Sequence, residues 1–93
     1  MIKIKIEFFG RARLIADQEY IYIDIEKQIM EIDLIKIIAS AKPALLGEVI
    51  DRKTFRLKKS YNFGINGIKN VNNNIMCLNN DDSILIFSSQ SGG

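Results

Sequence analysis

The 93-residue chain contains no histidine, no tryptophan, one proline and one cysteine. The lack of histidine excludes a zinc site of the usual Cys/His kind, a Ser-His-Asp triad and an imidazole general base. The single cysteine, Cys77, excludes an internal disulfide. Cys77 lies in a short apolar patch at residues 75–78, where no histidine can activate it. We therefore expect a small buried side chain at this position and not a nucleophile.

Long apolar runs and a strong charge imbalance are also missing. No apolar run approaches the roughly 20 residues that a membrane-spanning helix needs. The first residues alternate in polarity, unlike the basic head and apolar block of a signal peptide. Thirteen basic and eleven acidic residues give a net charge of +2, too small to predict nucleic acid as a partner. A hydrophobic fraction of 47% is typical of globular proteins, so we expect one soluble cytoplasmic domain.

The first part of the chain carries two segments of strand pattern. Residues 2–8 alternate between apolar and charged side chains, which indicates a half-buried strand. Phe9 breaks this alternation, because it falls on the face of the charged residues, and Gly10 opens a turn. Residues 20–25 alternate again, with three isoleucines on one face. The two segments predict an antiparallel hairpin.

The next segment changes to the period of a helix. Apolar residues recur at helical spacing and predict an amphipathic helix whose buried stripe consists of Met30, Leu34, Ile37, Ile38 and Ala41. Pro43 ends this helix, since the residue before a proline is disfavoured in helical conformation. The strand and helix patterns together predict a core that includes Ile4, Ile6, Ile23, Leu34 and Ile38.

The second half of the chain predicts further strands. Residues 52–59 contain five cations, which is typical of a solvated loop or a protected edge strand, or else of a docking patch for an acidic partner. Residues 61–65 lead into Asn66-Gly67, a strong hairpin signal, and residues 68–71 can pair back. Residues 83–87 are apolar on both faces and therefore predict a central strand. One main helix crossing a mixed sheet of four to five strands is an α+β roll.

The last six residues, 88–93, read Ser-Ser-Gln-Ser-Gly-Gly and cannot build a core. We expect a folded domain at 1–87 and a flexible tail at 88–93. Glycine adopts backbone conformations that other residues avoid, and its lack of a side chain lets it pass through a narrow channel. The tail is either a solvated chain end or an arm that presents the carboxylate of Gly93 to a partner enzyme.

Several of these motifs, in this order, resemble the MoaD/ThiS family of sulfur carriers, which have the ubiquitin-like β-grasp fold. Residues 8–13 (Phe-Phe-Gly-Arg-Ala-Arg) resemble the end of the family's first strand, and residues 33–35 (Asp-Leu-Ile) the start of its helix. Residues 65–67 (Ile-Asn-Gly) resemble its hairpin. The closing pattern of the family is matched by Leu78, Asp82, Ile84, Phe87, Gly92 and Gly93.

The resemblance implies a sulfur carrier that is not itself an enzyme and binds no cofactor. A ubiquitin-activating-type adenylating enzyme would use ATP to adenylate Gly93, which follows Gly92, and sulfur from a persulfide donor would convert it to a thiocarboxylate. As the small subunit of molybdopterin synthase, the chain would then insert its tail into the large subunit. Phe9, Arg13, Phe87 and Ser91 are the positions that the resemblance assigns to partner contacts.

Two departures from the family pattern leave alternatives open. Asp81 replaces a glycine in the last turn, which aspartate tolerates because it adopts left-handed angles more readily than most residues. Ser88-Ser89 stands where the molybdopterin branch commonly carries prolines. The alternatives are a ubiquitin-like protein modifier, a ThiS-like carrier for thiamine thiazole synthesis, and a β-grasp binding module that docks through Tyr20 and Tyr22 or the basic segment. Residues 43–60 favour the MoaD-like branch, because ThiS proteins tend to be shorter.

Overall fold

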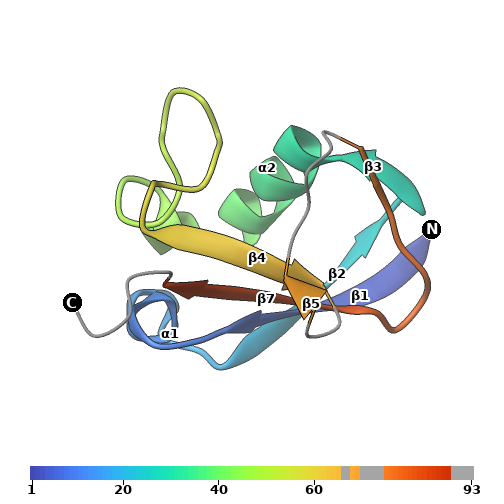
Figure 1. Cartoon of the computed structure of the whole chain (residues 1–93), viewed down its shortest axis with the longest axis horizontal. Coiled ribbons are helices and arrows are strands. Elements are labelled where there is room, and N and C mark those ends of the chain that lie inside the picture. The colour runs from blue at the N-terminus through green and yellow to red at the C-terminus, as the bar shows by residue number, and fades with distance from the viewer. Residues whose placement is uncertain (66–67, 70–74, 89–93) are drawn as a thin grey trace.

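The computed structural model describes residues 1–65, 68–69 and 75–88. Figure 1 shows an α+β arrangement in which the main helix, α2, lies across a twisted sheet. In chain order the elements are β1 (Ile2–Phe8), α1 (Arg11–Ala16), β2 (Tyr20–Ile25), β3 (Gln28–Met30), α2 (Glu31–Ala41), a 3₁₀ turn (Pro43–Leu45), β4 (Tyr61–Ile65), β5 (Ile68–Lys69), β6 (Ile75–Cys77) and β7 (Ser83–Ser88).

The main sheet has the strand order β2-β1-β7-β4-β5, so β7 is its central strand, as its apolar sequence predicted. Strands β1 and β7 run parallel and pair Ile6 with Ile84, while the other neighbours are antiparallel. The predicted hairpin of β1 and β2 is confirmed by their antiparallel pairing. β4 and β5 also pair, with Ile65 opposite Ile68, although Asn66 and Gly67 lie outside the described residues.

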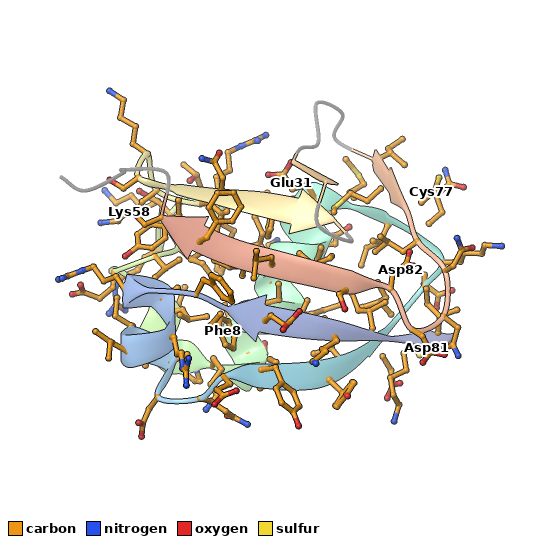
Figure 2. All side chains as sticks on the ribbon, turned by 60° about the horizontal axis from the view of Figure 1, so that its bottom comes forward. Phe8, Glu31, Lys58, Cys77, Asp81 and Asp82 are labelled. Carbon is orange, nitrogen blue, oxygen red and sulfur yellow. The ribbon has the colours of Figure 1, made fainter. Side chains whose placement is uncertain are left out.

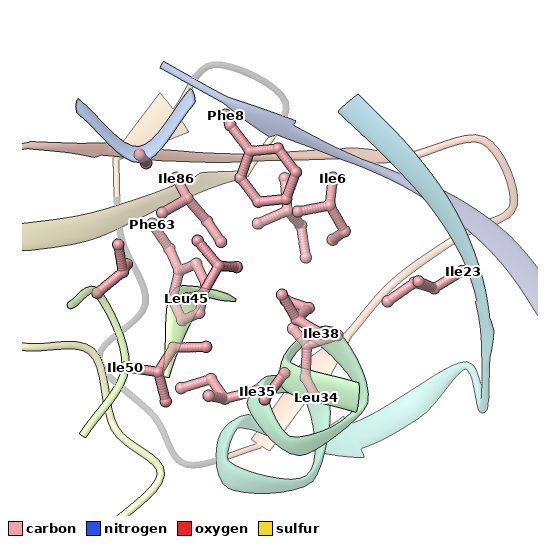
Figure 3. Close-up of a cluster of buried hydrophobic side chains, with 14 of the residues drawn as sticks. Ile6, Phe8, Ile23, Leu34, Ile35, Ile38, Leu45, Ile50, Phe63 and Ile86 are labelled. Carbon is pink, nitrogen blue, oxygen red and sulfur yellow. The ribbon is translucent and has the colours of Figure 1, made fainter. Parts of the chain in front are cut away.

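The core lies between this sheet and α2, as Figure 3 shows. Strand side chains such as Phe8 and Ile86 meet the helix side chains Leu34 and Ile38, and all four are almost completely buried. All five residues predicted for the core are buried, namely Ile4, Ile6, Ile23, Leu34 and Ile38. The alternation of the strands therefore predicted the correct face of the sheet.

The buried face of α2 is rotated from the predicted stripe. Ile35 and Ala39 are buried beside Leu34 and Ile38, whereas Met30 and Ala41 are exposed and Ile37 is half-buried. Met30 belongs to β3, and the helix begins one residue later. Ile35 and Ile37 are both apolar, so the spacing of apolar residues did not show which of the two lies on the buried face. The prediction placed Ile37 there, and the structure places Ile35 there. The prediction that the helix ends before Pro43 is confirmed.

Three elements were not predicted, namely α1, β3 and β6. Residues 11–16 form the short helix α1, where a turn was expected, and Ala12 and Ala16 are its buried residues. The apolar patch at 75–78 contains β6, which pairs with β3 in a second sheet of two strands. In β6 the side chains alternate, so Met76 is buried and Cys77 is exposed. The prediction of a buried Cys77 is therefore wrong, because the patch is a strand with one solvent-facing side.

The turn before β7 has the conformation that its sequence predicted. Asp81 has φ 73°, in the left-handed region, and its N–H donates to the carbonyl oxygen of Lys3. The Asp82 carboxylate accepts a hydrogen bond from the N–H of Asn79 at 2.8 Å, which closes the turn. Strand β7 then continues through Ser88, where the tail was predicted to begin, and residues 89–93 lie outside the described residues.

Candidate docking surface at the end of the central strand

Phe9 lies on the solvent side of the sheet at the end of β1. The alternation that buries Phe8, which is 1% exposed, turns Phe9 to the opposite face, where it is 55% exposed. Its backbone still belongs to the sheet, because its N–H donates to the carbonyl oxygen of Ile86 at 2.9 Å. The ring is therefore an exposed apolar group on a rigid backbone.

Phe87 lies next to this position, near the end of β7. The parallel register pairs Glu7 with Leu85 and Phe8 with Ile86, so one further step sets Phe9 beside Phe87. Phe87 is half-buried and pairs across the sheet with Asn62 of β4. The two phenylalanines thus lie side by side on the solvent face of the sheet, where β1 and β7 end. This position is called the corner of Phe9 and Phe87 below.

Helix α1 places Arg13 at the same end of the sheet as Phe9 and Phe87. The turn into this helix needs Gly10, whose φ of 59° is unfavourable for residues with a side chain. The helix packs against β7, and Figure 1 places it at the end where β7 finishes. Arg13 is exposed and its guanidinium donates to the Glu19 carboxylate at 2.8 Å. This ion pair was not predicted, and being exposed it contributes little stability but orients the guanidinium.

Tyr20 and Tyr22 lie on the same outer face, on the edge strand β2. Their rings meet edge to face, with centroids 5.5 Å apart, and the Lys5 Nζ lies 4.4 Å from the centre of the Tyr20 ring. Both tyrosines are exposed. The alternative docking residues therefore share a face with Phe9 and Phe87.

Leu14 of α1 was missed by the sequence interpretation. It is 79% exposed, because the spacing of Ala12 and Ala16 turns the other side of the helix to solvent. That four-residue spacing of small apolar residues was the signal available in the sequence. An exposed leucine adds to the apolar surface at this end of the molecule.

The remaining predicted site residues, Ser91, Gly92 and Gly93, lie outside the described residues. Within the described part of the chain, no group of three or more cysteine, aspartate or glutamate side chains is placed to hold a metal ion. Nor does any described helix have the length and apolar composition to cross a membrane.

Solved structures of similar shape were found, although no family model and no curated protein sequence matches the chain. The crystal structure of SAMP1 from Haloferax volcanii superposes with a TM-score of 0.80 at 20% identity, covering 98% of this chain and 99% of that one. The solution structure of small archaeal modifier protein 1 from Methanosarcina acetivorans gives 0.76 at 24% identity, covering 100% and 98%. A putative molybdopterin converting factor, subunit 1, from Pyrococcus furiosus gives 0.68 at 23% identity, covering 95% and 98%.

The fold is the ubiquitin-like β-grasp. These matches extend over nearly the whole length of both chains, so the β-grasp accounts for the whole of the described chain. In this β-grasp the corner of Phe9 and Phe87 lies where the central strand ends. A partner that bound the residues after Ser88 would therefore approach this end of the sheet.

Proposed function

We propose that the chain is a ubiquitin-like sulfur carrier whose Gly93 carboxylate is adenylated and then converted to a thiocarboxylate. The observation that carries the proposal is the combination of a β-grasp fold with a sequence that continues past its central strand into Gly92-Gly93. A free carboxylate is a poor acyl donor, because its oxygen is a poor leaving group. Adenylation by a partner enzyme with ATP supplies a good leaving group, AMP, which the terminal sulfur of a persulfide then displaces. A thiol then cleaves the resulting acyl disulfide, which leaves the thiocarboxylate on Gly93 and a new disulfide between that thiol and the sulfur donor.

The chain itself acts as a protein-borne substrate in this proposal and not as an enzyme. The activating enzyme supplies the nucleotide chemistry, which suits a sequence without histidine. Phe9, Arg13 and Phe87 are proposed as partner contacts, with Ser91 and Gly92 entering the partner's channel. Aromatic and arginine side chains are enriched among the residues that dominate binding energy at protein interfaces.

The acceptor we propose is the pterin precursor of the molybdenum or tungsten cofactor, with this chain as the small subunit of molybdopterin synthase. The resemblance to a putative molybdopterin converting factor subunit supports this choice. The names of the archaeal modifier proteins favour a second function, in which a lysine amine attacks the activated Gly93 and forms an isopeptide. Both functions share the adenylation step.

Adenylation can be tested by pyrophosphate exchange with an activating enzyme from the source organism. Deletion of Gly93, or addition of one alanine after it, should abolish exchange and leave thermal unfolding unchanged, because this residue follows the last strand. A Ser89→Ala variant, which keeps the length and the terminal carboxylate, serves as the control. Normal exchange by the deletion variant would contradict the proposal.

Mass spectrometry of the product separates the two functions. With a persulfide donor and a thiol reductant present, the carrier function gives a mass increase equal to the replacement of one oxygen by sulfur. The modifier function instead gives the chain joined through Gly93 to lysine side chains of other proteins.

A further inference from the structure

Positive charge is concentrated in the segment between Ile50 and β4, residues 51–60, here called the basic loop. Five of the thirteen basic residues and one of the eleven acidic residues lie in it, so its formal charge is +4. The rest of the chain has eight basic and ten acidic residues and therefore a charge of −2. The small net charge of the whole protein conceals this separation.

The basic loop is held in a defined conformation by hydrogen bonds. The Asp51 carboxylate accepts from the N–H groups of Lys53 and Thr54 at 2.8 and 3.0 Å, and the Asp51 N–H donates to the carbonyl oxygen of Arg56. Phe55 has φ 54° and packs against the core, with the Lys36 Nζ 5.4 Å from its ring centre. The cations therefore stand on a fixed scaffold.

The five cations of this loop point into solvent. All are exposed, namely Arg52, Lys53, Arg56, Lys58 and Lys59. Among the residues that the structure describes, the ion pairs are Lys5 with Glu7 and Arg13 with Glu19, and neither involves the loop. Asp51 attracts Lys58 at longer range, which leaves most of the positive charge available to a partner.

The basic loop lies at the end of the molecule where β7 finishes. Ser88 pairs with Tyr61, the residue that follows the loop, and the Tyr61 N–H donates to the carbonyl oxygen of Lys58. In Figure 2, Lys58 lies at this end, while Asp81 and Asp82 lie at the opposite end. Five residues extend at most about 18 Å, so a protein that holds Gly93 is brought close to the loop.

We propose that the basic loop docks against an acidic surface beside the channel of the protein that receives the tail. This inference rests on the proposed function, since it takes the tail to be bound by an activating enzyme. Cations on a hydrogen-bonded loop beside the tail raise the rate of association with an acidic partner and orient the encounter. Nucleic acid is a weaker fit, because Phe55, the aromatic residue within the loop, is partly buried against the core and is therefore a poor platform for base stacking.

The test compares two double variants with equal net charge. Lys53→Glu/Arg56→Glu reverses two cations in the basic loop, and Lys3→Glu/Lys27→Glu reverses two exposed cations away from it. Each changes the net charge from +2 to −2. Arg52 is left intact because its side chain lies over Gly47, where a Cβ atom would come within 2.9 Å of its Nε.

Association of each full-length chain with the purified activating enzyme is followed by stopped flow at low and high salt. We expect the loop variant to associate about tenfold more slowly than wild type at low salt, with the difference lost at high salt. The distant variant should change less than about twofold. A neutral Lys53→Gln/Arg56→Gln variant should lie between wild type and the charge reversal, and it replaces the charge reversal if that variant fails to fold.

Three results would overturn the inference. One is equal slowing by the loop and distant variants, which reports net charge alone. Another is an unchanged association rate for the loop variant. The third is unchanged enzyme association together with lost binding to a single-stranded RNA probe, which would assign the loop to nucleic acid. Failure of the proposed function is distinguished from all three, because the wild-type chain would then show no pyrophosphate exchange.

Discussion

Phe8 and Phe9 are neighbours in the sequence with opposite surroundings in the structure. Phe8 is buried in the core and Phe9 is largely exposed beside the end of β7. Phe9→Ala should change the free energy of unfolding by less than about 0.5 kcal/mol and weaken partner binding by about 2 kcal/mol or more. Denaturant unfolding and titration with the activating enzyme measure the two effects.

Phe8→Ala is the matched control for this experiment. It removes the same ring from a buried position and should destabilise the folded chain by about 3–5 kcal/mol. Binding per folded molecule should remain close to wild type. If Phe9→Ala caused the larger loss of stability, the assignment of Phe9 to a docking surface would be wrong.

Predictions from single residues succeeded where local alternation decides the environment. Phe9 was assigned to the solvent face by parity alone, and Asp81 was expected to tolerate the left-handed angles that it adopts. Cys77 was assigned wrongly because three apolar neighbours conceal a two-residue alternation. The pairing of Arg13 with Glu19 depends on the path of the chain between β1 and β2, which the sequence pattern does not specify.

At the scale of elements, long periodic segments were predicted and short ones were not. Strands β1, β2 and β7 have four or more alternating or apolar residues, and each was expected at its observed place. Helix α1 has six residues and no side-chain cap, and β3 and β6 have three residues each. Elements this short are formed by tertiary packing, so their sequences carry little signal of their own.

The basic loop carries a prediction at this scale. The N–H groups of Thr54 and Lys53 donate to the Asp51 carboxylate and hold its pKa below the ordinary value of 3.8. A pKa lowered by folding means that the charged form stabilises the fold. This contribution is complete above the unfolded pKa and is lost as the pH falls through the lower folded value.

Asp51→Asn tests this loop because it keeps an acceptor oxygen and removes the charge. The wild-type chain should be more stable than the variant at neutral pH, and the difference should shrink as the pH falls below 3.8. Denaturant unfolding at a series of pH values measures it, and a carbon-detected NMR titration reports the carboxyl pKa directly. A difference that stays constant down to strongly acidic pH would show that the charge does not matter.

At the scale of the whole molecule, one core joins segments that are far apart in the sequence. The parallel pairing of β1 with β7 brings residues near the two ends of the chain together, and α2 and the segment around Leu45 and Ile50 cover the same apolar face (Figure 3). The mixed sheet and its covering helix were predictable from the sequence. The second sheet was not, because its two strands, β3 and β6, have three residues each and are separated in the sequence by α2, β4 and β5.

A core of this kind should unfold as one cooperative unit. Ile6→Ala in the sheet and Ile38→Ala in the helix should each lower the free energy of unfolding by about 2–5 kcal/mol, because both side chains are fully buried. Lys3→Ala, at an exposed position of the same strand as Ile6, should cost less than about 0.5 kcal/mol.

Removal of residues 89–93 should cost equally little, since they follow the last strand. Urea unfolding followed by far-ultraviolet circular dichroism and by tyrosine fluorescence should give coincident transitions for every variant. Similar losses for Ile6→Ala and Lys3→Ala would show that the register of β1 is wrong, and a large loss on removal of 89–93 would show that the tail belongs to the folded domain.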